Sequence, residues 1–196
     1  ATVTDQSNRN SDAKGEYKGD LLVTFDDNST LEVKDQMLYV YENGDEKPVD
    51  PNKPVPTDAA TVTFTKDAAS IKAEGWDTVK PIIVKKGTKV PAAKFPNAEA
   101  KEGYKSVTWT PAKDTVVNAD QEFKASASKN SKADQVTELG GLKAKDIAVW
   151  VGDQITWANG VEAKDAAKKA EIDALLQGAT VTDQSNRNSD AKGEYK

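Results

Sequence analysis

Alternating apolar and polar residues recur in short stretches along the chain, and they predict a mainly β fold. Residues 20–41 are the clearest case, because two such stretches flank the polar turn Asp26-Asp27-Asn28-Ser29. We therefore predict a hairpin there, with one row of inward-facing side chains: Leu21, Val23, Phe25, Leu31 and Val33. The same alternation predicts strands at 60–66 and 147–151, and a short strand at 179–183.

One stretch has the spacing of a helix. Residues 163–178 are rich in Ala, Lys, Glu and Leu, which favour helix formation. Ile172, Leu175 and Leu176 share one face at spacings of three and four, and Gly178 stands where a helix commonly ends. We predict one helix near 163–177.

The chain contains a long identical repeat. Residues 179–196 repeat residues 1–18 letter for letter (ATVTDQSNRNSDAKGEYK), an offset of 178 residues (179 minus 1). Identity over 18 residues indicates a little more than one period of a tandem array, and a deliberate duplication of the segment is the other explanation.

Two polar junctions divide the chain. Residues 43–57 carry four prolines with charges between them, which is typical of a stiff linker, and 129–141 end in Gly140-Gly141. Between them lies a central module at 58–128. We interpret 1–42 as the C-terminal part of a second module type and 142–196 as the N-terminal part of the next such module. Residues 142–196 would then be completed by residues 19–41, within one chain or between chains.

The second module type resembles the Rib/alpha-like repeat of Gram-positive cell-surface proteins, in its longer form. The resemblance covers 142–196 plus 19–41. It rests on these motifs: Asp146-Ile147, Gly152-Asp153, Asn159-Gly160-Val161, Gly178 with the strand 179–183, Gly193-x-Tyr195, and the hairpin motif from Val23 to Val33. In that hairpin Phe25, Asp26 and Asn28 stand where the family usually has Tyr, Pro and Gly. The resemblance implies an Ig-like β-sandwich used as a stalk unit, without catalytic residues.

The central module resembles the Listeria–Bacteroides repeat of the internalin B-repeat kind. The motifs are Lys85-Lys86-Gly87-Thr88-Lys89-Val90-Pro91, the stretch from Gly103-Tyr104 through Trp109 to Val117, and the final Phe123-Lys124-Ala125. The family usually has a shorter spacing from Gly-Tyr to Trp, and Gly where Thr108 stands. The resemblance implies a small β-grasp-like fold, also without catalytic groups.

Composition narrows the range of chemistry. The chain has no Cys and no His, so it lacks a thiol nucleophile, the commonest general base and the commonest zinc ligand. The net charge of −5 disfavours nucleic acid as a partner, and no apolar run is long enough to insert into a membrane. We expect no enzyme activity and no cofactor.

Few residues are candidates for binding. Asp26, Asp27 and Asn28 are weak candidates for Ca²⁺, although a solvated hairpin turn explains them better. Trp76 lies in the polar stretch Glu74-Gly75-Trp76-Asp77 and is a weak candidate for stacking on a glycan. A Lys–Asn isopeptide bond is compatible with the composition, but nothing in the sequence localises one.

The sequence therefore favours a structural stalk or spacer of a bacterial adhesin that is anchored in the cell wall and exposed outside the cell. Neighbouring repeats of the same protein would be its first partners. The alternatives are an adhesive module that binds a glycan or a host surface protein, and homophilic adhesion between cells, as in biofilms, by head-to-tail or trans pairing.

Overall fold

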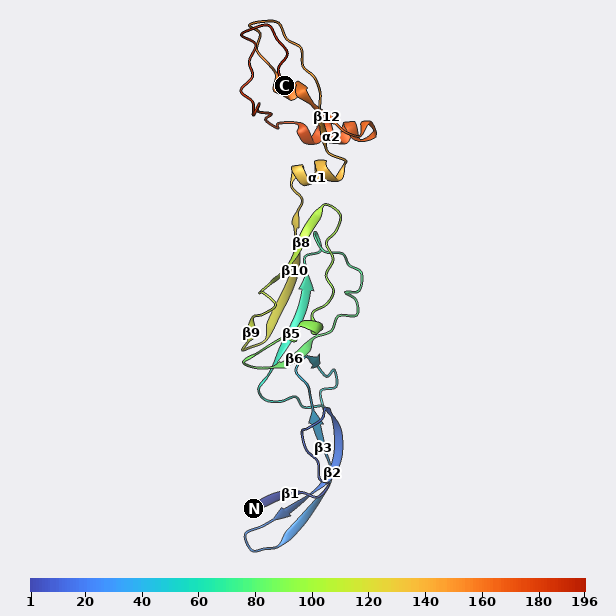
Figure 1. Ribbon diagram of the computed structural model, residues 1–196. Coiled ribbons are helices and arrows are strands. Elements are labelled where there is room, and N and C mark those ends of the chain that lie inside the picture. Colours follow the sequence, from blue (N-terminus) through green and yellow to red (C-terminus); the bar gives the residue numbers. More distant parts are fainter. The chain divides into compact units, whose positions relative to one another are not determined.

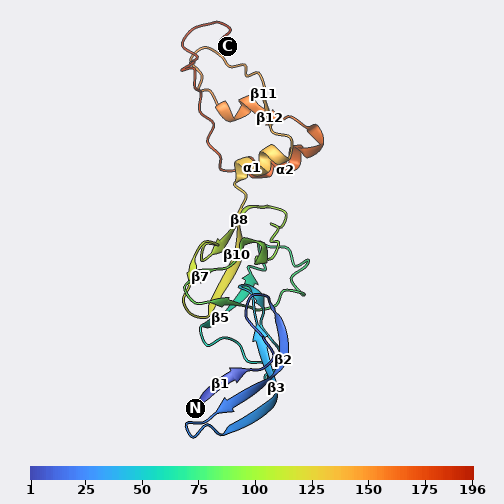
Figure 2. The same ribbon diagram turned by 60° about the horizontal axis from the view of Figure 1, so that its bottom comes forward.

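The computed structural model describes residues 1–196, and the chain divides into two compact units. Unit 1 comprises residues 1–102 and 106–128, and unit 2 comprises residues 103–105 and 129–196. The chain is mainly β, as the alternation predicts, with several small sheets (Figure 1 and Figure 2).

The first sheet of unit 1 is the predicted hairpin with one further strand. β2 (Gly15–Thr24) and β3 (Thr30–Val40) pair antiparallel, and β1 (Thr2–Asp5) pairs with the other edge of β2. The hairpin is confirmed, but the inward orientation of its apolar row is wrong in part. Phe25, Leu31 and Val33 are 41%, 58% and 42% exposed, because no second layer covers that side of the sheet.

The second sheet of unit 1 holds the larger core. Its strand order is β4-β6-β5-β10-β8, with β5 and β10 parallel and β6 antiparallel to β5. The bounds are β4 Asp45–Glu46, β5 Ala59–Lys66, β6 Ile82–Lys85, β8 Tyr104–Thr110 and β10 Gln121–Lys129. A small sheet, β7 (Thr88–Lys89) with β9 (Val116–Val117), and the 3-10 turn η1 (Ala92–Lys94) complete the module.

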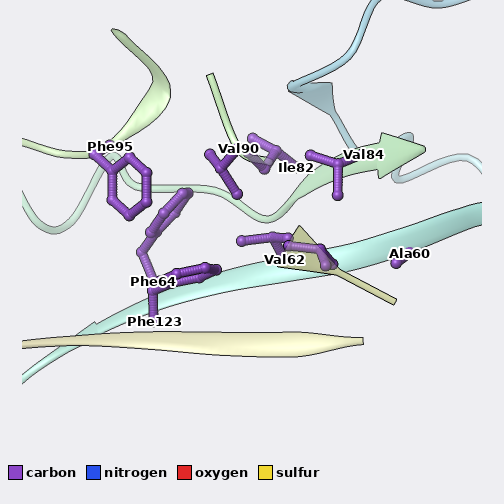
Figure 3. Packing of buried hydrophobic residues seen from close by; sticks show 9 residues of the cluster. Ala60, Val62, Phe64, Ile82, Val84, Val90, Phe95 and Phe123 are labelled. Atoms are coloured by element: carbon purple, nitrogen blue, oxygen red, sulfur yellow. The ribbon is translucent and has the colours of Figure 1, made fainter. Parts of the chain in front are cut away.

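The core follows directly from the alternation in β5. Val62 and Phe64 are buried, while the threonines between and beside them are half-buried. Phe64 meets Phe95 edge to face at 5.3 Å between ring centroids, and Phe95 meets Phe123 at 5.2 Å. Figure 3 shows these rings together with the aliphatic side chains of β5 and β6.

A buried carboxylate ties the two sheets of unit 1 together. Asp45, 6% exposed in β4, accepts a hydrogen bond from the Glu42 amide at 2.7 Å and pairs with the Lys14 ammonium, from the loop before β2. Burial opposes its ionisation, but these two donors outweigh burial and lower the pKa of Asp45. The joint between the sheets is therefore a closed polar contact.

The proline-rich stretch also contacts the hairpin. Lys53 pairs with Glu16 of β2, and the Tyr41 hydroxyl donates to the Pro54 carbonyl at 3.0 Å. Part of the predicted linker 43–57 thus belongs to structured elements, because β4 joins the sheet and residues 53 and 54 contact the hairpin.

Unit 2 has a smaller core built around two helices. α1 (Lys132–Glu138) and α2 (Lys169–Leu176) pack with the hairpin of β11 (Leu142–Ala144) and β12 (Val161–Ala163). Ile172 is completely buried and shares a cluster with Val136 and Ala163, while Leu175 and Leu176 are half-buried against it. The predicted apolar face of the second helix is confirmed.

Other sequence expectations in unit 2 are corrected by the structure. The predicted strand at 147–151 is wrong, since this segment forms no strand and its Trp150 is 83% exposed. The helix near 163–177 is shorter, beginning as the 3-10 turn η3 (Ala166–Lys168) before α2, and Asn159-Gly160 lie in another 3-10 turn, η2 (Trp157–Gly160).

The junction 129–141 is not a plain linker, because it contains α1. The Ser131 hydroxyl accepts from the Asp134 amide, and the Asp134 carboxylate accepts from the Ser131 amide, which forms a capping box at the start of α1. Gly140 and Gly141 end the helix with left-handed φ values of 101° and 81°.

The chain contains no helix with the length and apolar character needed to cross a bilayer.

Candidate functional site

The hairpin turn uses its own acceptor groups locally. The Asp27 carboxylate accepts hydrogen bonds from the Ser29 hydroxyl and, at 3.0 Å, from the Ser29 amide, and these bonds lower the pKa of Asp27. Asn28 takes the left-handed conformation, with φ of 63°. Asp26, Asp27 and Asn28 are all exposed, and nowhere does the chain bring three carboxylates together to hold a metal ion.

Trp76 lies at the rim of the core of unit 1. Its ring stacks on Trp109 at 6.1 Å between centroids with an interplanar angle of 30°, and both rings pack against the buried cluster. The Lys113 ammonium lies 5.7 Å from the Trp109 ring centroid and 5.1 Å from that of Phe95. One face of Trp76 is thus occupied by another indole.

A shallow groove of about 610 Å³ lies beside Trp76, on the same module. Its charged lining is already paired, with Lys72 contacting Glu99 at 3.0 Å and Lys80 contacting Glu46 at 3.4 Å. These opposed charges leave no single-sign surface that would select an ionic ligand.

The two copies of the repeated segment share one local contact. The Arg9 guanidinium donates to the Asp5 carboxylate at 2.6 and 2.9 Å, and Arg187 donates to Asp183 at 2.7 and 3.0 Å. The arginine in each case lowers the pKa of the aspartate. This contact is therefore a property of the segment itself.

The copies differ in everything that requires a distant partner. In the first copy, Arg9 also donates to the Gln36 carbonyl at 2.7 Å and to the Tyr17 carbonyl at 3.2 Å. In the second copy, Arg187 instead lies over the Trp157 ring at 5.0 Å. Thr2–Asp5 form β1, whereas the identical residues 180–183 form no strand, so the predicted strand at 179–183 is wrong.

One sheet carries the most distinctive surface of the molecule. β1, β2 and β3 present exposed apolar side chains, namely Val3, Phe25, Leu31 and Val33. Alternation in the sequence identifies these residues, but it predicts that they are buried. That they lie uncovered is a finding of the structure, and it makes this face the main candidate for binding.

Arg9 and Asp45 are the polar residues that sequence reasoning missed. Each depends on a contact across many residues, Arg9 with Gln36 and Asp45 with Lys14. The only local signal for Arg9 is its spacing of four residues from Asp5.

No family model matches this chain, and neither a curated protein nor a solved structure with significant similarity was found.

Proposed function

We propose that this chain is a structural spacer of a bacterial surface adhesin, anchored in the cell wall outside the cell and projecting a distal binding domain. One observation carries the proposal: residues 179–196 are identical to residues 1–18 in a chain of small β modules. Repeated modules of this kind add length with copy number, because each needs only its own core and contact with its neighbours.

The two module types follow the resemblances in the sequence. We propose that the larger core, within 58–128, is a β-grasp-like module, and that residues 142–196 continued by residues 19–41 form an Ig-like β-sandwich. The mainly β content and the five-stranded sheet with its own core are compatible with this assignment.

A mechanical role is supported by the contacts at the joint in unit 1. The ion pairs Lys14–Asp45 and Lys53–Glu16, with the hydrogen bond from Tyr41 to Pro54, connect the hairpin to the segment that follows it. Several contacts at one joint limit bending between the sheets more than a flexible linker does.

The charged groups also support a role without acid–base chemistry. Every carboxyl with a shifted pKa has it lowered, and every lysine with a shifted pKa has it raised, as for Asp134 and Lys34. A general acid or base that works near neutral pH needs the opposite directions. These groups act as partners in ion pairs.

Small-angle X-ray scattering on proteins of one, two and three 178-residue periods tests the proposal. A spacer predicts that the maximum dimension rises in proportion to the number of periods. The matched variant Asp45→Ala in every period loosens the joint while leaving the core side chains unchanged, and it should shorten the mean dimension. A maximum dimension that stays nearly constant as periods are added would contradict the spacer function.

An adhesive module is the second candidate, and the exposed indole of Trp150 favours it. This side chain is 83% exposed, whereas Trp76 is half-buried against Trp109. A glycan and matrix-protein binding screen, with Trp150→Ala compared with Trp76→Ala, separates the two candidates. Binding that depends on Trp150 supports adhesion, and no binding by any multi-period protein excludes it.

A further inference from the structure

The sheet β1-β2-β3 has one apolar face and one polar face. Its register aligns Val3 with Val23 and Val23 with Leu31, and it pairs Leu21 with Val33. Residues directly opposite each other in a sheet point to the same side, so these side chains form one continuous apolar surface, which Phe25 extends. The opposite face carries Thr2, Thr4, Thr24, Thr30 and Glu32.

This apolar face is open to solvent. Val3, Leu31 and Val33 are 60%, 58% and 42% exposed. An antiparallel sheet with one apolar face ordinarily packs that face on a second layer. A clustered apolar patch on a soluble protein, as opposed to scattered residues, marks an interaction surface.

Unit 2 contains a segment that lacks a partner of the same kind. Ile147, Val149 and Val151 alternate as in a strand, yet the segment pairs with nothing, and Val149 and Val151 are 43% and 60% exposed. The only sheet of unit 2 is the short pair β11 and β12. The segment therefore has the sequence of a strand without a sheet to join.

The repeat identifies which surfaces belong together. The same 18 residues precede the hairpin at one end of the chain and follow α2 at the other. In the first setting, four of them pair with the sheet as β1, and in the second the identical four are unpaired. A sequence that fits the sheet and also continues from α2 connects the segment Leu142–Leu176 to the open sheet face.

We propose that the apolar face of β1-β2-β3 is an interaction surface for a second copy of this chain, which buries Val149 and Val151 of its segment Leu142–Leu176 against Leu31 and Val33. This inference rests on the exposed face and the repeat, and it goes beyond the spacer function. The two surfaces differ, so the contact is head to tail and leaves one open surface at each end of an assembly.

Sedimentation velocity of the full 196-residue chain over a wide concentration range tests the proposal. The weight-average mass should at least double at the highest concentrations. Leu31→Asp and Val151→Asp each change a side chain that is already exposed, so both variants should fold, and each alone should stay monomeric. Thr30→Asp, on the polar face of the same sheet, is the matched control and should associate like the unaltered chain.

Mixing the two variants gives the sharpest outcome. Each retains one intact surface, so an equimolar mixture should form a complex that stops at two chains. If the sheet faces pair with one another instead, Val151→Asp alone would dimerise, and the proposal would be wrong. A chain that stays monomeric at every concentration would also overturn it.

Discussion

Arg9 closes a bidentate contact on Asp5 and at the same time reaches β3, where its Nη1 donates to the Gln36 carbonyl at 2.7 Å. The side chain is only 7% exposed, and it fastens the loop between β1 and β2 to the hairpin. The identical Arg187 keeps the contact with Asp183 but has no carbonyl in a distant strand. The repeat thus supplies a matched comparison of one residue in two settings.

Replacing Arg9 with Ala should destabilise unit 1 more than Arg187→Ala destabilises unit 2. The carbonyls of Gln36 and Tyr17 would each lose a donor, and an unsatisfied, half-buried carbonyl costs about 1–3 kcal/mol. Chemical denaturation followed by NMR of each unit measures both changes. Equal losses in the two variants would show that the long-range bonds of Arg9 contribute nothing.

Gly19 provides space for that arginine. A Cβ atom at this position would lie 2.5 Å from Arg9 Nε and 2.7 Å from Ser7 Oγ, so Gly19→Ala should displace the guanidinium. We expect the substitution to be costly in the unaltered chain and nearly neutral beside Arg9→Ala, with a coupling energy of about 0.5–3 kcal/mol.

A double-mutant cycle measured by denaturation determines this coupling. Gly15→Ala is the control, because a Cβ there meets only Tyr17 and should not couple to Arg9. Additive effects of Gly19→Ala and Arg9→Ala would refute the close approach as the reason for glycine.

The two cores should respond separately to truncation. Phe123 is completely buried in unit 1, and its replacement by Ala should cost about 3–5 kcal/mol, while Ile172→Ala in unit 2 should cost about 2–5 kcal/mol. Hydrogen exchange resolved by residue should show faster exchange in the altered unit only. If either substitution accelerated exchange in both units equally, the division into two cores would be wrong.

Part of this fold can be predicted because certain segments contain both a pattern and a partner. β5 shows the period of a strand and lies between β6 and β10, and α2 shows the period of a helix and buries Ile172. Residues 147–151 show an equally clear alternation, yet they form no strand, because a strand also needs a neighbour for its backbone hydrogen bonds. Periodicity states which side would be buried and says nothing about what covers it.

α1 is the element that periodicity does not reveal, since its segment is short and polar. The signal lies in its ends, where Ser131 and Asp134 have the spacing of a capping box and Gly140-Gly141 stop the helix. Among candidate site residues, the turn at Asp26 to Ser29 is local and therefore predictable. The contact of Arg9 with Gln36 spans 27 residues and requires the register of the hairpin.

Asp134 should keep its charge in acid solution. The Lys105 ammonium and the Ser131 hydroxyl and amide all bond its carboxylate and lower its pKa to about 2. Because the folded pKa lies below the ordinary value of 3.8, the contribution to stability is complete above pH 4 and is lost as the pH falls toward 2.

NMR titration of the side-chain carboxyl carbon measures this pKa directly. Lys105→Met removes the largest contribution and should raise the pKa of Asp134 toward 3.8, and Ser131→Ala should raise it by less. High salt should have the same direction of effect, because the pair is exposed. An unchanged pKa in Lys105→Met would contradict the ion pair.

The repeated segment should change structure when it is given a sheet. Thr2–Asp5 are a strand because they pair with Leu21–Thr24, and the chain has no such residues after Lys196. Adding residues 19–41 directly after Lys196 supplies them, so residues 180–183 should become a strand, paired as Thr2–Asp5 are paired now. Secondary chemical shifts of Val3 and Val181 report on the two copies independently, and they should differ in the original chain and converge in the extended one. The control is an extension of the same composition with Leu21 and Val23 exchanged for the polar residues beside them, which disrupts the apolar row. If Val181 kept its irregular shifts in the extended chain, the strand at the first copy would depend on something other than its pairing with β2, and the two copies would not be interchangeable.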